Sequence, residues 1–131
     1  MLDDITVRTV ELIPITPDDL PGYAVRLYDA ATASPDVSRF VAWYQLQRGT
    51  DTTPRASVEE ATREKITKVA AALDEGTITS PLNAAELVLT IQAIARMWTT
   101  QPRETLTAAG EDTHARRDTV RTAVQALVAR R

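Results

Sequence analysis

Residues 83–98 read NAAELVLTIQAIARMW, and on a helix this stretch is apolar around most of its circumference. One apolar stripe ends at Trp98, and a second apolar stripe falls on another side of the helix. A helix that is apolar on two sides must be covered on both. At this chain length we expect the second cover to be another subunit. The predicted dimer contacts on this helix are Ala85, Leu89, Ala93 and Met97.

The rest of the chain also divides into helical segments. Asn83 with Glu86 (or Ser80-Pro81 before them) is expected to cap the apolar helix, and Ser57 with Glu60 has the spacing of a capping box. The first segment is β-branched and nearly alternating in places, so a strand remains an alternative there. Residues 102–110 are expected to be a polar connection. The expected helices cover about residues 2–13, 19–31, 34–49, 57–76, 83–98 and 112–130.

The last of these segments also has two stripes. One consists of larger aliphatic residues, and the other of small residues that allow close approach of a neighbouring backbone. With about six helices and no convincing hairpin signal, the sequence predicts one all-α domain over residues 1–131. The predicted dimer contacts on the last helix are Thr119, Thr122 and Ala126.

Composition excludes several functional classes. The 131 residues carry a net charge of −3, which gives no strongly basic face for nucleic acid, and there is no cysteine for disulfide or thiolate chemistry. No signal peptide or membrane-spanning run is visible, so we expect a cytoplasmic protein without a membrane partner. His114 is the single histidine and is expected to face solvent near a helix start. We therefore predict no catalytic residue, no metal site and no cofactor.

The stretch LPGYAVRLYDAATASPDVSRFVAWYQLQRG at residues 20–49 resembles the C-terminal region of TetR-type transcriptional regulators. SPDVSRFVAWYQLQ is its most specific piece, and the two closing helical segments are similar to that family as well. The resemblance implies that the last two helices form a four-helix bundle with a second subunit. It also implies a pocket for a small-molecule inducer among the preceding helices. The family's three-helix DNA-binding head has no counterpart here, so DNA is expected only through a head outside these residues.

Five of the six aromatic residues are candidates for lining that pocket, although filling the core is an equally good explanation for each. We expect the strongest contributions from Trp43 and Trp98. Thr90 and Gln92 interrupt the apolar helix and are expected to pair across a dimer axis or to face the pocket. The predicted ligand-binding residues are Tyr28, Phe40, Trp43, Tyr44, Ile66, Leu73, Ile94 and Trp98.

These observations favour the effector-binding and dimerisation domain of a TetR-like repressor, with an apolar or amphipathic inducer. The alternative is a helical dimerisation or protein-interaction module that binds no ligand. An enclosed apolar cavity beside Trp43 and Trp98 distinguishes the first from the second. A small helical enzyme is not supported by any constellation of residues.

Overall fold

The computed structural model describes residues 13–33 and 56–130, and this part of the chain is helical. The all-α prediction is confirmed. The expected helices at residues 2–13 and 34–49 lie outside the described residues. The elements are α2 (Leu20–Ala33), α4 (Ala56–Asp74), β1 (Ile78–Thr79), α5 (Ala84–Thr100), α6 (Arg103–Ala109), α7 (Thr113–Gln125) and β2 (Ala129–Arg130).

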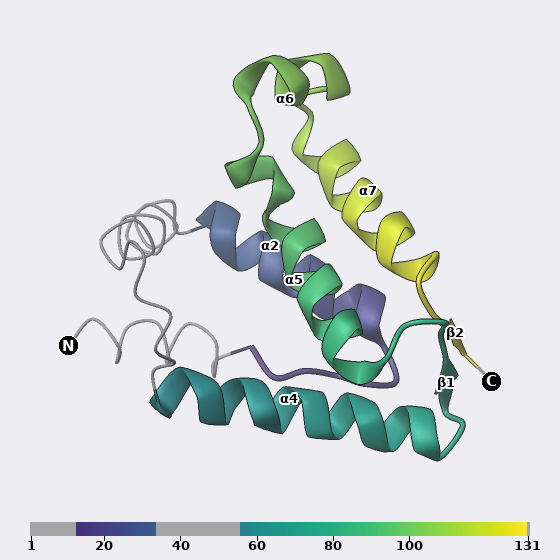
Figure 1. The fold of residues 1–131 in the computed structure, drawn as a ribbon. Coiled ribbons are helices and arrows are strands. Elements are labelled where there is room, and N and C mark those ends of the chain that lie inside the picture. The colour runs from purple at the N-terminus through teal and green to yellow at the C-terminus, as the bar shows by residue number, and fades with distance from the viewer. Residues whose placement is uncertain (1–12, 34–55, 131) are drawn as a thin grey trace.

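Three helices, α2, α5 and α7, lie alongside one another, and α4 crosses beneath α2 and α5 (Figure 1). The core lies between these four helices. Its largest wholly buried side chain is Tyr23 of α2, which belongs to one buried cluster with aliphatic residues of α4, α5 and α7. Each helix contributes one apolar stripe to this core, as expected for amphipathic helices in a small domain.

Helix α5 begins as its sequence predicts. The Asn83 side chain accepts a hydrogen bond from the Glu86 backbone N–H at 2.8 Å, and the Glu86 carboxylate accepts one from the Asn83 backbone N–H at 2.9 Å. This reciprocal capping box satisfies two backbone donors that the helix itself cannot pair. The stripe containing Leu87 and Ile91 is buried, whereas Leu89 on the other side is 69% exposed.

Helix α4 ends at the expected glycine. Gly76 has a φ of +76°, which only glycine adopts at little cost. Its N–H donates to the Leu73 carbonyl at 3.2 Å and that of Thr77 donates to the Ala72 carbonyl at 3.0 Å, which is the Schellman pattern. The helix begins at Ala56. The side chain of Ser57 lies outside the described part, so its capping box stays a prediction.

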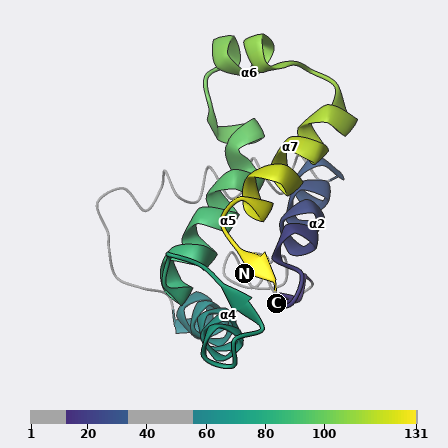
Figure 2. The ribbon, with the colours of Figure 1, turned by 90° about the vertical axis from the view of Figure 1, so that its right-hand side faces the viewer.

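Two sequence predictions are wrong at the C-terminal end. The expected connection contains helix α6, which starts after Pro102 with Glu104 in its first turn and ends at Gly110, where φ is +115°. Figure 2 shows α6 projecting away from the other helices, and none of its residues is buried. The last helix ends at Gln125 and not at residue 130.

The residues after α7 form a strand instead. Ala129 pairs with Thr79 and Arg130 with Ile78 in a two-stranded antiparallel sheet. The Ser80 hydroxyl donates a hydrogen bond to the Leu127 carbonyl at 2.6 Å, which helps to hold the chain beside β1. Among the residues that the structure describes, no helix is long and apolar enough to cross a membrane.

Candidate functional site

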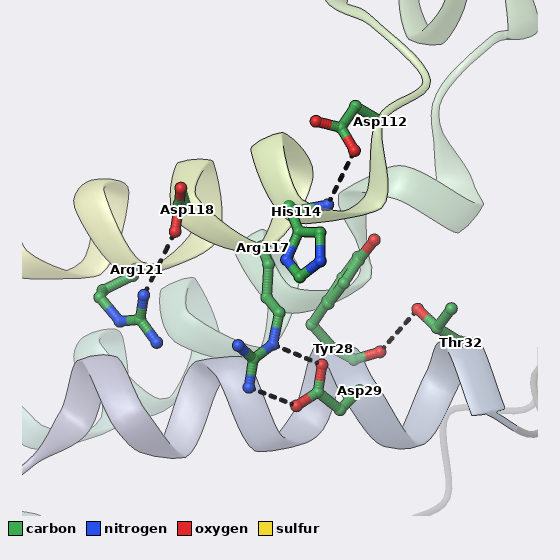
Figure 3. A network of polar contacts seen from close by, with 8 residues as sticks. All are labelled: Tyr28, Asp29, Thr32, Asp112, His114, Arg117, Asp118 and Arg121. Carbon is green, nitrogen blue, oxygen red and sulfur yellow. Dashed lines mark hydrogen bonds and ion pairs between the residues drawn. The ribbon is translucent and has the colours of Figure 1, made fainter.

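An ion pair connects α2 and α7 at the centre of Figure 3. Arg117 donates through Nε to Asp29 Oδ1 and through Nη2 to Asp29 Oδ2, both at 2.9 Å. This two-point geometry fixes the direction of both side chains. The ring of Tyr28, the residue before Asp29, extends from α2 toward the first turn of α7. The pair therefore holds α7 in place over a buried tyrosine.

Trp98 near the end of α5 lies against the same first turn of α7. The guanidinium of Arg116 is 4.6 Å from the centroid of the Trp98 ring, within cation–π range. Arg116 is itself held by a 2.8 Å hydrogen bond from its Nε to the Gly110 carbonyl. The Trp98 Nε1 is shielded from solvent and has no hydrogen-bond partner in the described part of the chain.

A second polar cluster lies where α2, α4 and α5 meet, and we call it the Tyr23–Lys65 cluster. The Lys65 Nζ donates a 3.0 Å hydrogen bond to the Tyr23 hydroxyl, and the ammonium is 5.4 Å from the centroid of the Tyr23 ring. Lys65 is 7% exposed and Tyr23 is wholly buried. Lysine is seldom buried to this extent in protein cores.

Burial changes the acid–base behaviour of this cluster. Burial, together with the positive charges of Arg96 and Lys68, lowers the pKa of Lys65 from 10.5 to about 8. Burial raises the pKa of Tyr23 above its usual 10.0, and this outweighs the opposite effects of a hydrogen bond with Gln92 and of nearby arginines. The cluster is thus a polar, partly ionised site inside an apolar core.

The structure brings several predicted ligand-binding residues to the same core. Tyr28 is part of the buried cluster, and the other four described members are half-buried against it. Phe40, Trp43 and Tyr44 lie outside the described residues, so the predicted cavity beside Trp43 stays untested. Those four half-buried residues are Ile66, Leu73, Ile94 and Trp98.

An open hollow of about 430 Å³ lies elsewhere, between the start of α2 and the end of α7. None of the predicted ligand-binding residues lines it. Only about half of its lining is apolar, and it opens to solvent, so it does not match the predicted enclosed apolar pocket. The lining residues are Asp19, Pro21, Gly22, Arg121, Gln125 and Val128.

Residues 19–130 match the family model of the tetracyclin repressor-like C-terminal domain. The chain belongs to this TetR C-terminal domain family. It is 29% identical over 122 residues to the HTH-type transcriptional repressor SCO4008 of Streptomyces coelicolor, which is 90% of this chain and 64% of that protein. The chain therefore spans slightly less than two thirds of this curated relative.

A solved structure of a regulator has the same fold as this chain. The crystal structure of SCO4942, a candidate transcriptional regulator from Streptomyces coelicolor, is similar to this chain with a TM-score of 0.83 and 28% identity. The similarity covers 99% of this chain and 71% of that chain. The TetR-like fold predicted from residues 20–49 and the two closing helices is thereby confirmed.

In this TetR-like domain, most of the predicted dimer contacts are on the surface. Leu89 lies exposed on α5. Thr119 and Thr122 on α7 are exposed as well, and so is Ala126, which follows the last residue of α7. Met97 is different, because it is half-buried and packs against the subunit's own core. The exposed members of the predicted set are Ala85, Leu89, Ala93, Thr119, Thr122 and Ala126.

The structure also places two polar residues that the sequence analysis singled out, Gln92 and His114. Gln92 is half-buried on α5, close enough to the Tyr23 hydroxyl to oppose the rise of its pKa. His114 is exposed in the first turn of α7, as predicted, and its backbone N–H donates to the Asp112 carboxylate at 3.2 Å. In the described ranges, no group of three or more acidic or histidine side chains is placed to hold a metal ion.

Sequence reasoning missed Lys65. The signal was available, because Lys65 lies four residues after Ala61 and four before Val69, and both of these are buried. A lysine at such a position falls on the apolar stripe of its helix. Its burial then requires a polar partner, which Tyr23 supplies from a helix more than forty residues earlier in the chain.

Proposed function

We propose that this chain is the effector-binding and dimerisation domain of a TetR-family transcriptional repressor. The observation that carries the proposal is the Tyr23–Lys65 cluster, in which polar groups are buried within the apolar core of a TetR-like domain. Small-molecule sites in proteins are mostly apolar and contain a few such polar groups that orient the ligand. The effector that suits this environment is an apolar or amphipathic small molecule.

The exposed face of α5 supports the dimerisation part of the proposal. Leu89 is the large apolar side chain that stands out as exposed in the described chain. Ala85 and Ala93 lie one helical turn to either side of it, and they are exposed too. Burying this face against a second copy, together with the small residues of α7, would form the bundle expected for the family.

A mechanism follows from the contacts of α2. This helix packs against both α5 and α7, and the Asp29–Arg117 pair fixes it to α7. An effector that binds better to one arrangement of these helices shifts the population toward that arrangement. In this proposal the change passes through α2 and residues 13–19 toward a DNA-binding head outside the 131 residues. The relative SCO4008 is an HTH-type transcriptional repressor, which agrees with such a role.

Native mass spectrometry tests the proposal. The purified chain is expected to have the mass of two subunits, and a retained small molecule is expected to appear when the protein is denatured. A thermal-shift screen of apolar and amphipathic compounds on emptied protein provides the matching measurement, since a ligand that binds only the native state raises its melting temperature.

The same experiment distinguishes the alternative function. A dimer that retains no small molecule and shows no thermal shift with any compound contradicts effector binding and supports a dimerisation or interaction module. A monomer at micromolar concentration contradicts the dimerisation part. The Lys65→Met variant tests whether the Tyr23–Lys65 cluster takes part in binding. A compound that binds at the cluster should raise the melting temperature of this variant by a different amount than it raises that of the wild type.

A further inference from the structure

We propose that the Trp98 indole N–H is a hydrogen-bond donor for the effector, and that the effector therefore carries a carbonyl or carboxylate oxygen. This inference rests on the proposed effector-binding function and specifies the ligand class. It starts from the Trp98 Nε1, which is shielded from solvent and has no acceptor among the described residues. Buried donors are almost always paired in folded proteins, because an unpaired one loses its hydrogen bond to water.

The ring that carries this donor is held in place. Trp98 packs against the apolar core, and the Arg116 guanidinium lies 4.6 Å from its ring centroid. Arg116 is fixed in turn by its 2.8 Å hydrogen bond to the Gly110 carbonyl. An indole held in this way cannot easily turn toward an acceptor. The effector therefore has to place its acceptor atom beside the fixed N–H. A donor fixed before binding also loses less entropy when the ligand arrives.

Local charge restricts the ligand further. Arg116 places a positive charge over the ring, and the neighbouring Arg117 is already paired with Asp29. A cationic effector would be repelled by the Arg116 guanidinium, whereas a carbonyl or carboxylate oxygen is attracted to both the guanidinium and the N–H. The structure thus favours neutral or anionic molecules that have an apolar body and an exposed oxygen acceptor.

A matched pair of probes tests this assignment. 2-Acetylnaphthalene and 2-isopropenylnaphthalene have nearly the same shape, but only the first has a carbonyl oxygen. Equilibrium dialysis of the full chain is expected to show about 3- to 10-fold tighter binding of the acetyl probe, the range for one neutral hydrogen bond. Trp98→Phe should reduce this preference to about one and leave the affinity for the isopropenyl probe nearly unchanged.

A second measurement keeps the Trp98 indole in place and so does not need the Trp98→Phe variant. The chain has two tryptophans, so a ¹⁵N–¹H correlation spectrum of the wild type has two indole N–H signals. The Trp98 signal is the one that remains in Trp43→Phe. The acetyl probe should move this signal downfield, as a new hydrogen bond does, and the isopropenyl probe should not.

The outcomes separate the two proposals. Equal affinity for both probes, or a preference that survives in Trp98→Phe, overturns the assignment of Trp98 while apolar effector binding stands. Binding of neither probe at its solubility limit contradicts effector binding and the Trp98 assignment together. A Trp98→Phe chain that becomes monomeric also overturns the assignment, because the indole then serves subunit association and not the effector.

Discussion

Asp29 and Arg117 are 88 positions apart in the chain, and their side chains meet through two parallel 2.9 Å hydrogen bonds. Asp29 lies on α2 and Arg117 on α7, so this contact fixes the relative position of the first and last described helices. Hydrogen bonding to Asp29 raises the pKa of Arg117 above its usual value. Both side chains are more than one-third exposed, which limits the contribution of the pair to stability.

The first prediction concerns this pair. Asp29→Asn and Arg117→Gln should each lower the melting temperature by a few degrees, because each removes one partner of a two-point contact. The double variant should lose less than the sum of the two single losses. Thermal melts by circular dichroism measure this coupling, and 1 M NaCl should reduce it by screening. Strictly additive losses would mean that the two side chains do not stabilise each other.

The second prediction concerns pH. The pKa of Lys65 is about 8 in the folded chain and near 10.5 when unfolded, so the unfolded state binds more protons between these values. The free energy of unfolding should therefore rise from pH 8 toward pH 10, by about 2 kcal/mol. Above the unfolded pKa of Lys65, near 10.5, the trend should reverse, because the raised pKa of Tyr23 means that the folded state then holds the extra proton.

Urea unfolding at several pH values measures this profile. Lys65→Met should flatten the rise, since it keeps an apolar stem and removes the titrating group. Lys68→Met is the matched control: Lys68 is an exposed lysine on the same helix. The explanation fails if Lys65→Met retains the full rise or if Lys68→Met abolishes it.

The third prediction tests the face of α5 proposed as the dimer contact. Leu89→Glu should weaken the dimer by roughly 100-fold or more, because it places an unpaired charge in a desolvated contact. Sedimentation velocity over a range of concentrations measures the effect. Ala71→Glu, at an exposed position on α4, is the control and should leave the dimer intact. A Leu89→Glu chain that sediments as the wild-type dimer does would exclude this face.

The fourth prediction concerns the capping box of α5. Asn83→Ala should lower the free energy of unfolding by about 1 kcal/mol, because the Glu86 backbone N–H loses its acceptor. Asn83→Asp keeps an oxygen at the same position and should cost much less. Urea midpoints at constant slope compare the two variants. Equal losses would show that the cap contributes little.

Much of the helical framework was predictable because its signals are local. The start of α5 follows from two residues three positions apart, Asn83 and Glu86, and the end of α4 follows from Gly76. The buried stripe of α5 follows from periodicity alone, whereas the predicted cover of Leu89 by a second subunit stays a prediction. These features depend on neighbours within one or two turns, so a single sequence contains the information.

The missed features depend on residues far apart or on weak patterns. Helix α6 has no apolar stripe, so nothing marks it except Pro102 and Gly110 at its ends. The sequence predicts helix as far as residue 130 because Ala129 continues the small-residue stripe of the last helix. The pairing of residues 129–130 with Ile78 and Thr79 joins segments about fifty residues apart. The burial of Lys65 also depends on a distant helix, and periodicity cannot show which helix covers it.

The short sheet has a consequence for the order of folding. Pairing of β1 with β2 joins both ends of the segment that contains α5, α6 and α7, and Ile78 in β1 is 1% exposed. Closing a loop of this length carries a large entropic cost that two strand residues repay only in part. We therefore expect the two strands to pair late in folding, after the helices have docked. We also expect this pairing to be the first contact that opens when the domain is pulled from its C-terminal end.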